Sequence, residues 1–195
     1  MNLFKNRFIA HRGLHKSIII PENSIQAFKN AMGKNYAIEF DINITIDKQI
    51  VIFHDDDLNR LCNKKERIEE VTYDFLKDLK LYESDEKIPL LKELLVEISG
   101  KIPLVIEIKK HKNIGILENK LVDLLENYKG KYLICSFEKD ILFWFKKNKP
   151  NFKRGLIFES NPKKFEKYNK TLFLYKYYKT KADFISLDYK LLDSS

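Results

Sequence analysis

Three carboxylate residues lie in short apolar runs, and their types and spacing predict metal chemistry. Glu39 and Asp41 belong to the run Ala37–Ile42, and Glu107 belongs to Leu104–Ile108. In extended backbone, alternation puts Glu39 and Asp41 on one face of their strand. Carboxylates facing a sheet interior do not stay ionised there without a compensating charge. Oxygen ligands without His or Cys favour a hard cation, so we expect Ca²⁺ or Mg²⁺ beside all three.

Two cationic residues near these carboxylates could bind an anion. Arg12 can fork onto two phosphate oxygens, and Lys109 supplies a point charge. Structural alternatives are open for both residues. Lys109, two residues after Glu107, could pair with one of the carboxylates, with the others solvated at a rim. Arg12 could form an ion pair with Glu22 or Asp41.

His11 and His54 are candidates for acid–base catalysis. Each follows an apolar run and precedes a polar loop. Histidine titrates near neutral pH, so one ring can take a proton from a nucleophile while the other protonates a leaving oxygen. A lone histidine is more often a surface residue, and we expect His15 and His111 to be surface residues.

The elements around these residues follow from hydrophobic patterning. We expect strands at 8–10, 37–42 and 49–53, with a helix from about Ser24 to a cap at Gly33 and Asn23 or Ser24 as its N-cap. A turn over Thr45–Lys48 makes the second and third strands an antiparallel pair. Centred near residues 47–48, this turn sets Asp41 beside His54.

The rest of the chain alternates helix and strand. We expect a loop at 56–70, a helix from a Thr72 cap to about 81, a polar break at 82–87, helices at 89–98, 114–128, 139–147 and about 163–170, and strands at 104–108, 132–136, 153–158 and 184–187. Such alternation predicts a parallel sheet, either a (β/α) barrel or an open α/β sheet. The expected elements amount to six parallel strands and a hairpin strand at the rim. A full barrel has eight parallel strands and takes roughly 250 residues, so this chain is too short for one. We expect one domain over residues 1–195, with a small insertion around 56–88.

Short motifs in a fixed order run from about residue 8 to residue 188. They are His11-Arg12-Gly13, Pro21-Glu22-Asn23-Ser24 with Ala27-Phe28, Glu39-Phe40-Asp41, Thr45 with Asp47, His54-Asp55, Leu58 with Arg60, Ile106-Glu107-Ile108-Lys109 and Ser136-Phe137. In this order and spacing they resemble the glycerophosphodiester phosphodiesterase family.

The resemblance implies a TIM-type (β/α) barrel that hydrolyses glycerophosphodiesters to sn-glycerol 3-phosphate and an alcohol, with a divalent cation. It implies the acid–base pair His11 and His54, and a role for Glu22 at the substrate or behind it. It also implies two further C-terminal strands with Trp-Thr and Thr-Asp motifs, which do not follow Leu187. We therefore expect a C-terminally incomplete barrel, with a possible homo-oligomer covering its open edges.

Composition agrees with a globular domain of this kind. The formal net charge is +8, but the excess Lys is scattered and forms no Arg-rich stripe, so we expect no nucleic-acid partner. Cys62 and Cys135 fit no metal or redox motif, and Cys135 belongs to an apolar run. With no evident signal peptide and no apolar run of ~18 residues, we expect a cytoplasmic protein without a transmembrane segment.

Two alternatives to a glycerophosphodiesterase stay open. One is a catalytically weak or inactive truncated fold that at most binds phosphate or metal, as the missing strands would suggest. The other is a lysophospholipid-cleaving relative, which would need an apolar loop surface. The retained site residues favour a small-molecule phosphodiester as the substrate.

Overall fold

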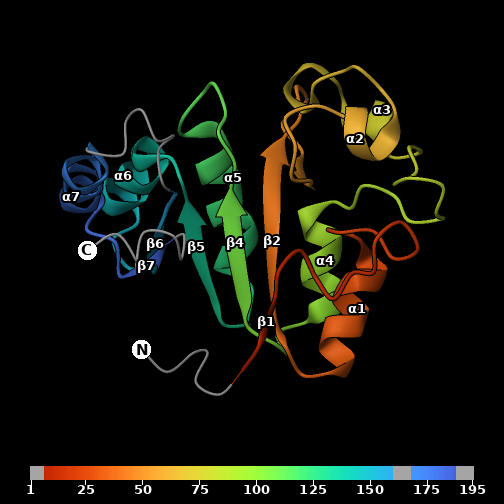
Figure 1. Cartoon of the computed structure of the whole chain (residues 1–195), viewed down its shortest axis with the longest axis horizontal. Coiled ribbons are helices and arrows are strands. Elements are labelled where there is room, and N and C mark those ends of the chain that lie inside the picture. The colour runs from red at the N-terminus through yellow and green to blue at the C-terminus, as the bar shows by residue number, and fades with distance from the viewer. Residues whose placement is uncertain (1–6, 160–167, 188–195) are drawn as a thin grey trace.

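One twisted sheet organises the chain. The computed structural model describes residues 7–159 and 168–187. Among these, seven strands follow the order β1-β2-β4-β5-β6-β7, with β3 added to β2. The strands are β1 (Ile9–Ala10), β2 (Ala37–Ile44), β3 (Ile50–Ile52), β4 (Leu104–Ile108), β5 (Tyr132–Ser136), β6 (Arg154–Phe158) and β7 (Phe184–Leu187). All neighbours pair in parallel except β2 and β3, which are antiparallel (Figure 1). This is the expected incomplete (β/α) barrel.

Helices connect the strands and cover the outer face of the sheet. They are α1 (Ile25–Gly33), α4 (Leu91–Ile98), α5 (Ile116–Glu126), α6 (Lys139–Asn148) and α7 (Asn169–Thr180). Figure 1 shows α5 behind β4, and the short helices α2 (Asn59–Cys62) and α3 (Tyr73–Leu76) beyond the C-terminal end of β2. None of the described helices is long and apolar enough to span a bilayer.

Alternation along β2 separates the apolar core from the polar face. Ile38, Phe40 and Ile42 are fully buried against the helices, together with Phe28 of α1 and Leu121 of α5. Phe28 and Phe40 meet edge to face with ring centroids 5.9 Å apart. The intervening residues of β2 therefore point to the inner face, as the alternation predicts.

The register of the hairpin differs by one residue from the prediction. The pairs Ile42–Ile52 and Ile44–Ile50 show that the turn centres on Asp47 alone. The amide of Thr45 donates to the carbonyl of Gln49, and Lys48 adopts φ 63°, the left-handed conformation of a three-residue turn. Continuing this register, Asp41 lies opposite Phe53 rather than His54.

The insertion at 56–88 is more ordered than expected. The predicted loop 56–70 contains α2 and a 3₁₀ turn at Ile68–Glu70, and the helix capped by Thr72 ends at Leu76 instead of 81. The reason is a second small core, in which Leu58, Leu61 and Ile68 pack under the insertion. Apolar burial here outweighs the polar composition on which the loop prediction rested.

Other element boundaries differ in smaller ways. Ser24 is the N-cap of α1, while Gly33 is its last residue and Lys34 follows as the C-cap. The helix expected to begin at 89 begins at Leu91. The helix expected at 163–170 falls largely outside the described residues, and α7 instead runs through the aromatic segment to Thr180. Phe173 explains this, because it packs on Phe158 of β6 with ring centroids 5.4 Å apart.

Phe40 tests the importance of the outer-face core. Removing a fully buried aromatic side chain leaves a cavity, so Phe40→Ala should lower the free energy of unfolding by about 3–5 kcal/mol. Phe75→Ala is the control, because Phe75 is 41% exposed on α3, and it should change stability by less than about 1 kcal/mol. Urea titrations followed by circular dichroism measure both. Equal losses would show that this core does not carry the fold.

Candidate active site

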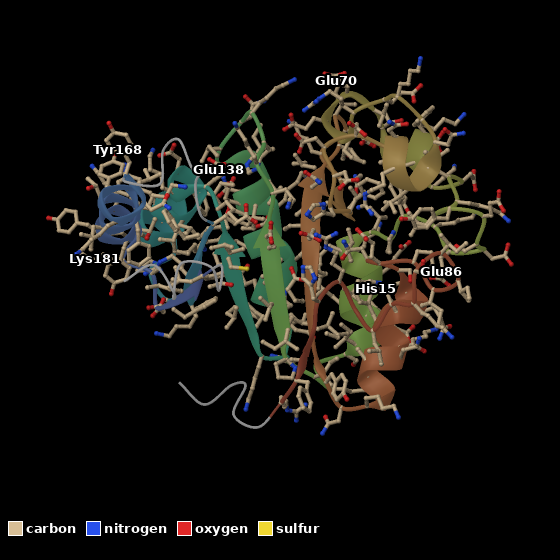
Figure 2. The ribbon with its side chains drawn as sticks, in the orientation of Figure 1. His15, Glu70, Glu86, Glu138, Tyr168 and Lys181 are labelled. Atoms are coloured by element: carbon tan, nitrogen blue, oxygen red, sulfur yellow. The ribbon has the colours of Figure 1, made fainter. Side chains whose placement is uncertain are left out.

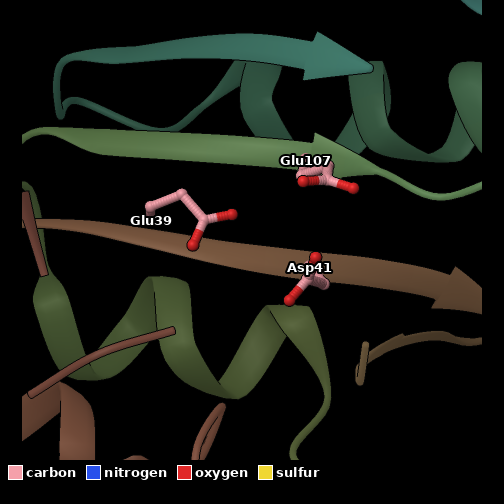
Figure 3. A group of neighbouring side chains, drawn as sticks. All are labelled: Glu39, Asp41 and Glu107. Carbon is pink, nitrogen blue, oxygen red and sulfur yellow. The ribbon is translucent and has the colours of Figure 1, made fainter. Parts of the chain in front are cut away.

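Three buried carboxylates meet on the inner face of the sheet. Glu39 and Asp41 come from β2 and Glu107 comes from β4, where the parallel register puts Asp41 directly beside Glu107. One oxygen of each side chain lies within 4.8 Å of the others (Figure 3). The residues are 8%, 1% and 7% exposed, respectively. The alternation predicted from sequence therefore brings all three together.

Burial and like charge make this cluster electrostatically unfavourable on its own. Burial, then the charge of Asp41, raises the pKa of Glu39 to about 8. The same two causes, in the same order, raise the pKa of Glu107. Oε1 of Glu39 and Oδ1 of Asp41 are buried and accept no hydrogen bond from the described residues. Buried carboxylate oxygens that accept no hydrogen bond are suitable ligands for a hard cation.

Two basic side chains offset part of the negative charge. Nζ of Lys109 lies 2.7 Å from Glu107 and 3.5 Å from Asp41. Nε of Arg12 lies 3.5 Å from Oδ2 of Asp41, and the backbone amide of Arg12 donates to Glu39 at 2.9 Å. The ion pairs considered as structural alternatives are therefore present. Lys109 is within ion-pair distance of Oδ1 of Asp41 but forms no hydrogen bond with it, and Oε1 of Glu39 also accepts no hydrogen bond from the described residues.

The backbone after β1 positions Arg12. Arg12 adopts φ 56°, and Gly13 follows at φ 80°. A Cβ on Gly13 would lie 2.9 Å from Cβ of Ala27, so the tight turn against α1 requires glycine at this position. The turn brings the Arg12 guanidinium to Glu22, with Nη1 2.8 Å from Oε1. Glu22 thereby contacts the site through Arg12.

The two candidate histidines occupy different surroundings. His54 follows β3, and its Nδ1 lies 2.6 Å from Oδ1 of Asp55, which favours the tautomer with the proton on Nδ1. The side chain of His11 is 69% exposed, and its Nε2 lies 3.9 Å from Oε2 of Glu39. His11 therefore lies at the edge of the carboxylate cluster, and His54 is near enough to Glu107 for its charge to affect the pKa of that residue. Of the two histidines, His54 has a carboxylate partner at hydrogen-bond distance.

Sequence reasoning assigned no role to two residues that contact the site. Asp55 orients His54, and Nδ2 of Asn23 donates to Oδ2 of Asp41 at 2.9 Å. Asn23 adopts φ 56°, a conformation that asparagine tolerates better than most residues. The position of Asp55 directly after His54 was the available signal. The sequence predicts the cap of α1 at Asn23 or Ser24, and Ser24 fills that role.

The prediction for His111 was wrong, whereas that for His15 is confirmed. His15 is exposed on the loop between β1 and α1 (Figure 2). His111 is buried, with Nε2 3.1 Å from Oε1 of Glu118 and Nδ1 2.9 Å from the carbonyl oxygen of Lys109. Burial lowers the pKa of His111, but its contacts with Glu118 and with the carbonyl of Lys109, together with nearby negative charge, raise this pKa overall. An inward-facing glutamate on α5 keeps this histidine in the interior.

A hollow of about 700 Å³ opens beside the carboxylates. Its polar lining comes from His11, Glu39, Glu107, Glu159 and Ser186. The remaining lining is mainly apolar: Ile9, Val105, Leu133, Cys135, Phe137, Ile157, Phe158, Phe184, Ile185 and Leu187. Cys135 is buried there, as expected for a small apolar residue. The acidic and histidine side chains of this lining can receive a charged group, and apolar side chains surround them.

Comparison with known proteins identifies the family. Residues 11–189 match the model of the glycerophosphoryl diester phosphodiesterase family. The chain belongs to this family. The match includes every candidate site residue between His11 and Lys109.

Individual relatives agree with the family match. A glycerophosphodiester phosphodiesterase of Caldanaerobacter subterraneus is 35% identical over 170 residues, covering 80% of this chain and 68% of the relative. A glycerophosphodiester phosphodiesterase of Bacillus altitudinis is 30% identical over 164 residues, covering 77% of this chain and 66% of the relative. The chain thus spans about two thirds of the length of these curated relatives.

Solved structures of the family confirm the fold. The Thermotoga maritima glycerophosphodiester phosphodiesterase superposes with a TM-score of 0.74 at 25% identity, covering 96% of this chain and 76% of that one. An Oleispira antarctica phosphodiesterase, solved with the product sn-glycerol-3-phosphate, superposes with a TM-score of 0.79 at 23% identity. The match covers 95% of this chain and 78% of that one. The likeness to the second is evidence for the fold alone.

The raised pKa of Glu39 should give the metal-free protein a pH-dependent stability. The folded-state pKa of about 8 exceeds the unfolded value of 4.5, so folding retains a proton that the unfolded chain releases. The contribution of Glu39 is therefore full below pH 4.5 and is lost as the pH rises through about 8. With chelator present, we expect the melting temperature to fall between about pH 6 and about pH 9, and Glu39→Gln to reduce this fall.

Calorimetry or dye-based melting measures the effect. In a chain of this size, each kcal/mol lost from the free energy of unfolding lowers the melting temperature by about 2–4 °C. Glu83→Gln is the control, because Glu83 is an exposed carboxylate in the insertion. An identical pH slope in the parent protein and Glu39→Gln would refute the role of Glu39.

Proposed function

We propose that this family member hydrolyses glycerophosphodiesters to sn-glycerol 3-phosphate and an alcohol in a reaction that depends on a divalent cation. The observation that carries the proposal is the buried cluster of Glu39, Asp41 and Glu107, flanked by two histidines and two basic side chains. The cluster lies toward the C-terminal ends of parallel strands, where barrel enzymes place their sites. The names of the curated relatives support this substrate class.

Glu39, Asp41 and Glu107 would hold the cation. Their donor set consists of oxygen alone, and two of those oxygens are buried without a hydrogen-bond donor among the described residues. This set fits Ca²⁺ or Mg²⁺ better than a softer metal. When bound, the cation would neutralise a phosphate oxygen and stabilise the charge that develops in the transition state.

Arg12 and Lys109 would bind the phosphate beside the carboxylates. Lys109 bonds Glu107, and Arg12 bonds Glu22, so both basic side chains are oriented before the substrate arrives. The fork of Arg12 suits two phosphate oxygens, whereas Lys109 acts as a point charge. Glu22 would act through Arg12, by holding its guanidinium in place.

His11 and His54 would move the protons. The hydrogen bond from Nδ1 of His54 to Asp55 leaves Nε2 as the proton acceptor, and Asp55 would stabilise the imidazolium that forms. His54 is accordingly the favoured base, and His11 the favoured donor to the departing alkoxide. The attacking group is either water or the neighbouring glycerol hydroxyl, which would form a cyclic phosphate first.

A weak or inactive phosphodiesterase fold is the second candidate. It is favoured by the exposure of His11 and by the hollow that opens between the two ends of the sheet path. A loosely held donor would lower the rate without removing phosphate or metal binding. The activity assay below separates the two candidates.

Metal and histidine dependence test the proposed function directly. Release of sn-glycerol 3-phosphate from several glycerophosphodiesters should require Ca²⁺ or Mg²⁺ and stop with chelator. His11→Ala and His54→Ala should each lower kcat by ~10²-fold or more, because each removes one proton-transfer group. Arg12→Ala should mainly raise KM.

His15→Ala is the matched control, because His15 lies on an exposed loop close to His11 in sequence. Chelator-insensitive turnover would contradict the metal role. Phosphate or metal binding without turnover, under all these conditions, would favour the inactive fold.

We also propose that a second copy of the chain covers the open sheet edges. In the described part of the chain, β1 pairs only with β2, and β7 only with β6. Unpaired strand edges are ready sites for pairing with another chain. Multi-angle light scattering should therefore give the mass of a dimer or higher oligomer. A monomer with full activity would show that the exposed edges need no partner.

A further inference from the structure

Arg60 of α2 bridges two carboxylates that come from different loops. Nε and Nη2 of Arg60 lie 2.7 and 3.1 Å from the two oxygens of Asp55. Nη1 and Nη2 lie 3.0 and 2.7 Å from the two oxygens of Glu22. Both carboxylates are thus held in a two-pronged geometry, the arrangement in which a guanidinium binds most specifically.

Each of these carboxylates contacts a residue of the proposed active site. Asp55 lies 2.6 Å from Nδ1 of His54, and Glu22 lies 2.8 Å from Nη1 of Arg12. Five side chains thus contact one another in the order Arg12, Glu22, Arg60, Asp55 and His54, with basic groups and carboxylates alternating. Arg60 is the middle member of this series and bonds the two carboxylates rather than Arg12 or His54.

The insertion fixes the backbone of Arg60 while leaving its side chain beside the site. Leu58 and Leu61, on either side of Arg60, are buried in the small core of the insertion. The amide of Tyr82 donates to the carbonyl of Leu61, which ties α2 to the far end of the insertion. The Arg60 side chain is 41% exposed, at the outer rim of the site.

We propose that Arg60 is a positioning residue that couples the acid–base half of the site to its phosphate-binding half. This inference rests on the proposed function, which gives His54 and Arg12 their roles. Arg60 fixes the rotamer of Asp55, and Asp55 keeps the proton of His54 on Nδ1. Arg60 also fixes Glu22, which orients Arg12. Removing it should loosen both halves together.

The charges support this arrangement. Burial raises the pKa of Asp55, but the hydrogen bonds from Arg60 and His54 outweigh burial, so that this pKa is lowered overall. Burial likewise raises the pKa of Glu22, but the hydrogen bonds and charges of Arg60 and Arg12 together lower it overall. Lysine could supply the charge of Arg60 but could not bind both carboxylates through paired donors.

The tautomer of His54 gives a test that needs no activity. In ¹⁵N-histidine spectra recorded above the titration range, the parent protein should show the Nδ1–H form of His54, identified by its loss in His54→Ala. Arg60→Ala should give a mixture of tautomers, because Asp55 is then free to rotate. Arg67→Ala is the matched control, because Arg67 lies in the same insertion and bonds Asp56 instead. It should leave His54 unchanged.

Kinetics provide the second readout. Arg60→Ala should lower kcat and raise KM, with kcat/KM reduced by about 10–100-fold, the usual range for residues that orient ligands or catalysts. Arg60→Lys should show a smaller loss of kcat/KM, because lysine keeps the positive charge but lacks the paired donors of the guanidinium. If Arg60→Ala does not fold, Arg60→Lys and Asp55→Asn should still shift the tautomer.

The outcomes separate the two proposals. A parent protein that hydrolyses no glycerophosphodiester defeats the proposed function, while the spectra still decide the link from Arg60 to His54. An unchanged tautomer and an unchanged kcat/KM in folded Arg60→Ala would overturn the positioning role. A loss shared equally by Arg60→Ala and Arg67→Ala would also overturn it, because it would reflect the stability of the insertion alone.

Discussion

Repulsion among three buried carboxylates is the constraint on which the rest of this structure depends. Glu39, Asp41 and Glu107 are held close together by adjacent parallel strands, and apolar packing on the opposite face of the sheet keeps those strands in register. The favourable burial on one face therefore maintains an unfavourable charge density on the other. Functional sites commonly show such local conflict within an otherwise consistent fold.

The neighbouring groups reduce this conflict without removing it. Arg12 and Lys109 each lie within ion-pair distance of the cluster, and Asn23 donates one hydrogen bond to Asp41. Adding full compensation from the protein would fill the site and leave no attraction for an external cation. The partial compensation keeps the fold intact and preserves an affinity for positive charge.

Sequence patterns were sufficient for the central sheet and for the carboxylate cluster. The strands expected at 104–108 and 132–136 coincide with β4 and β5, because buried parallel strands read as continuous apolar runs. The strand expected at 184–187 coincides with β7, although β7 is largely exposed. Strict alternation then fixed the common face of Glu39 and Asp41. These signals are local, and a single sequence contains them in full.

Several of the failures come from side-chain contacts between different segments of the chain. His111 is buried because Glu118 of α5 turns toward it, and the insertion folds because its scattered leucines find a common core. The bridge from Glu22 to Arg60 joins residues 38 positions apart. Neither periodicity nor composition encodes such pairings, even though the family resemblance included Arg60 among its motifs.

The position of β2 between a local and a distant partner has a consequence for the order of folding. β3 pairs with β2 through a three-residue turn, whereas β4 reaches β2 only after the whole insertion. Short loops close at lower entropic cost, so the hairpin should form first. Glu39 and Asp41 are then still solvated, and their repulsion with Glu107 arises only as β4 docks. A divalent cation present during refolding should therefore accelerate that docking step, and stopped-flow rates that do not respond to the cation would argue against this order.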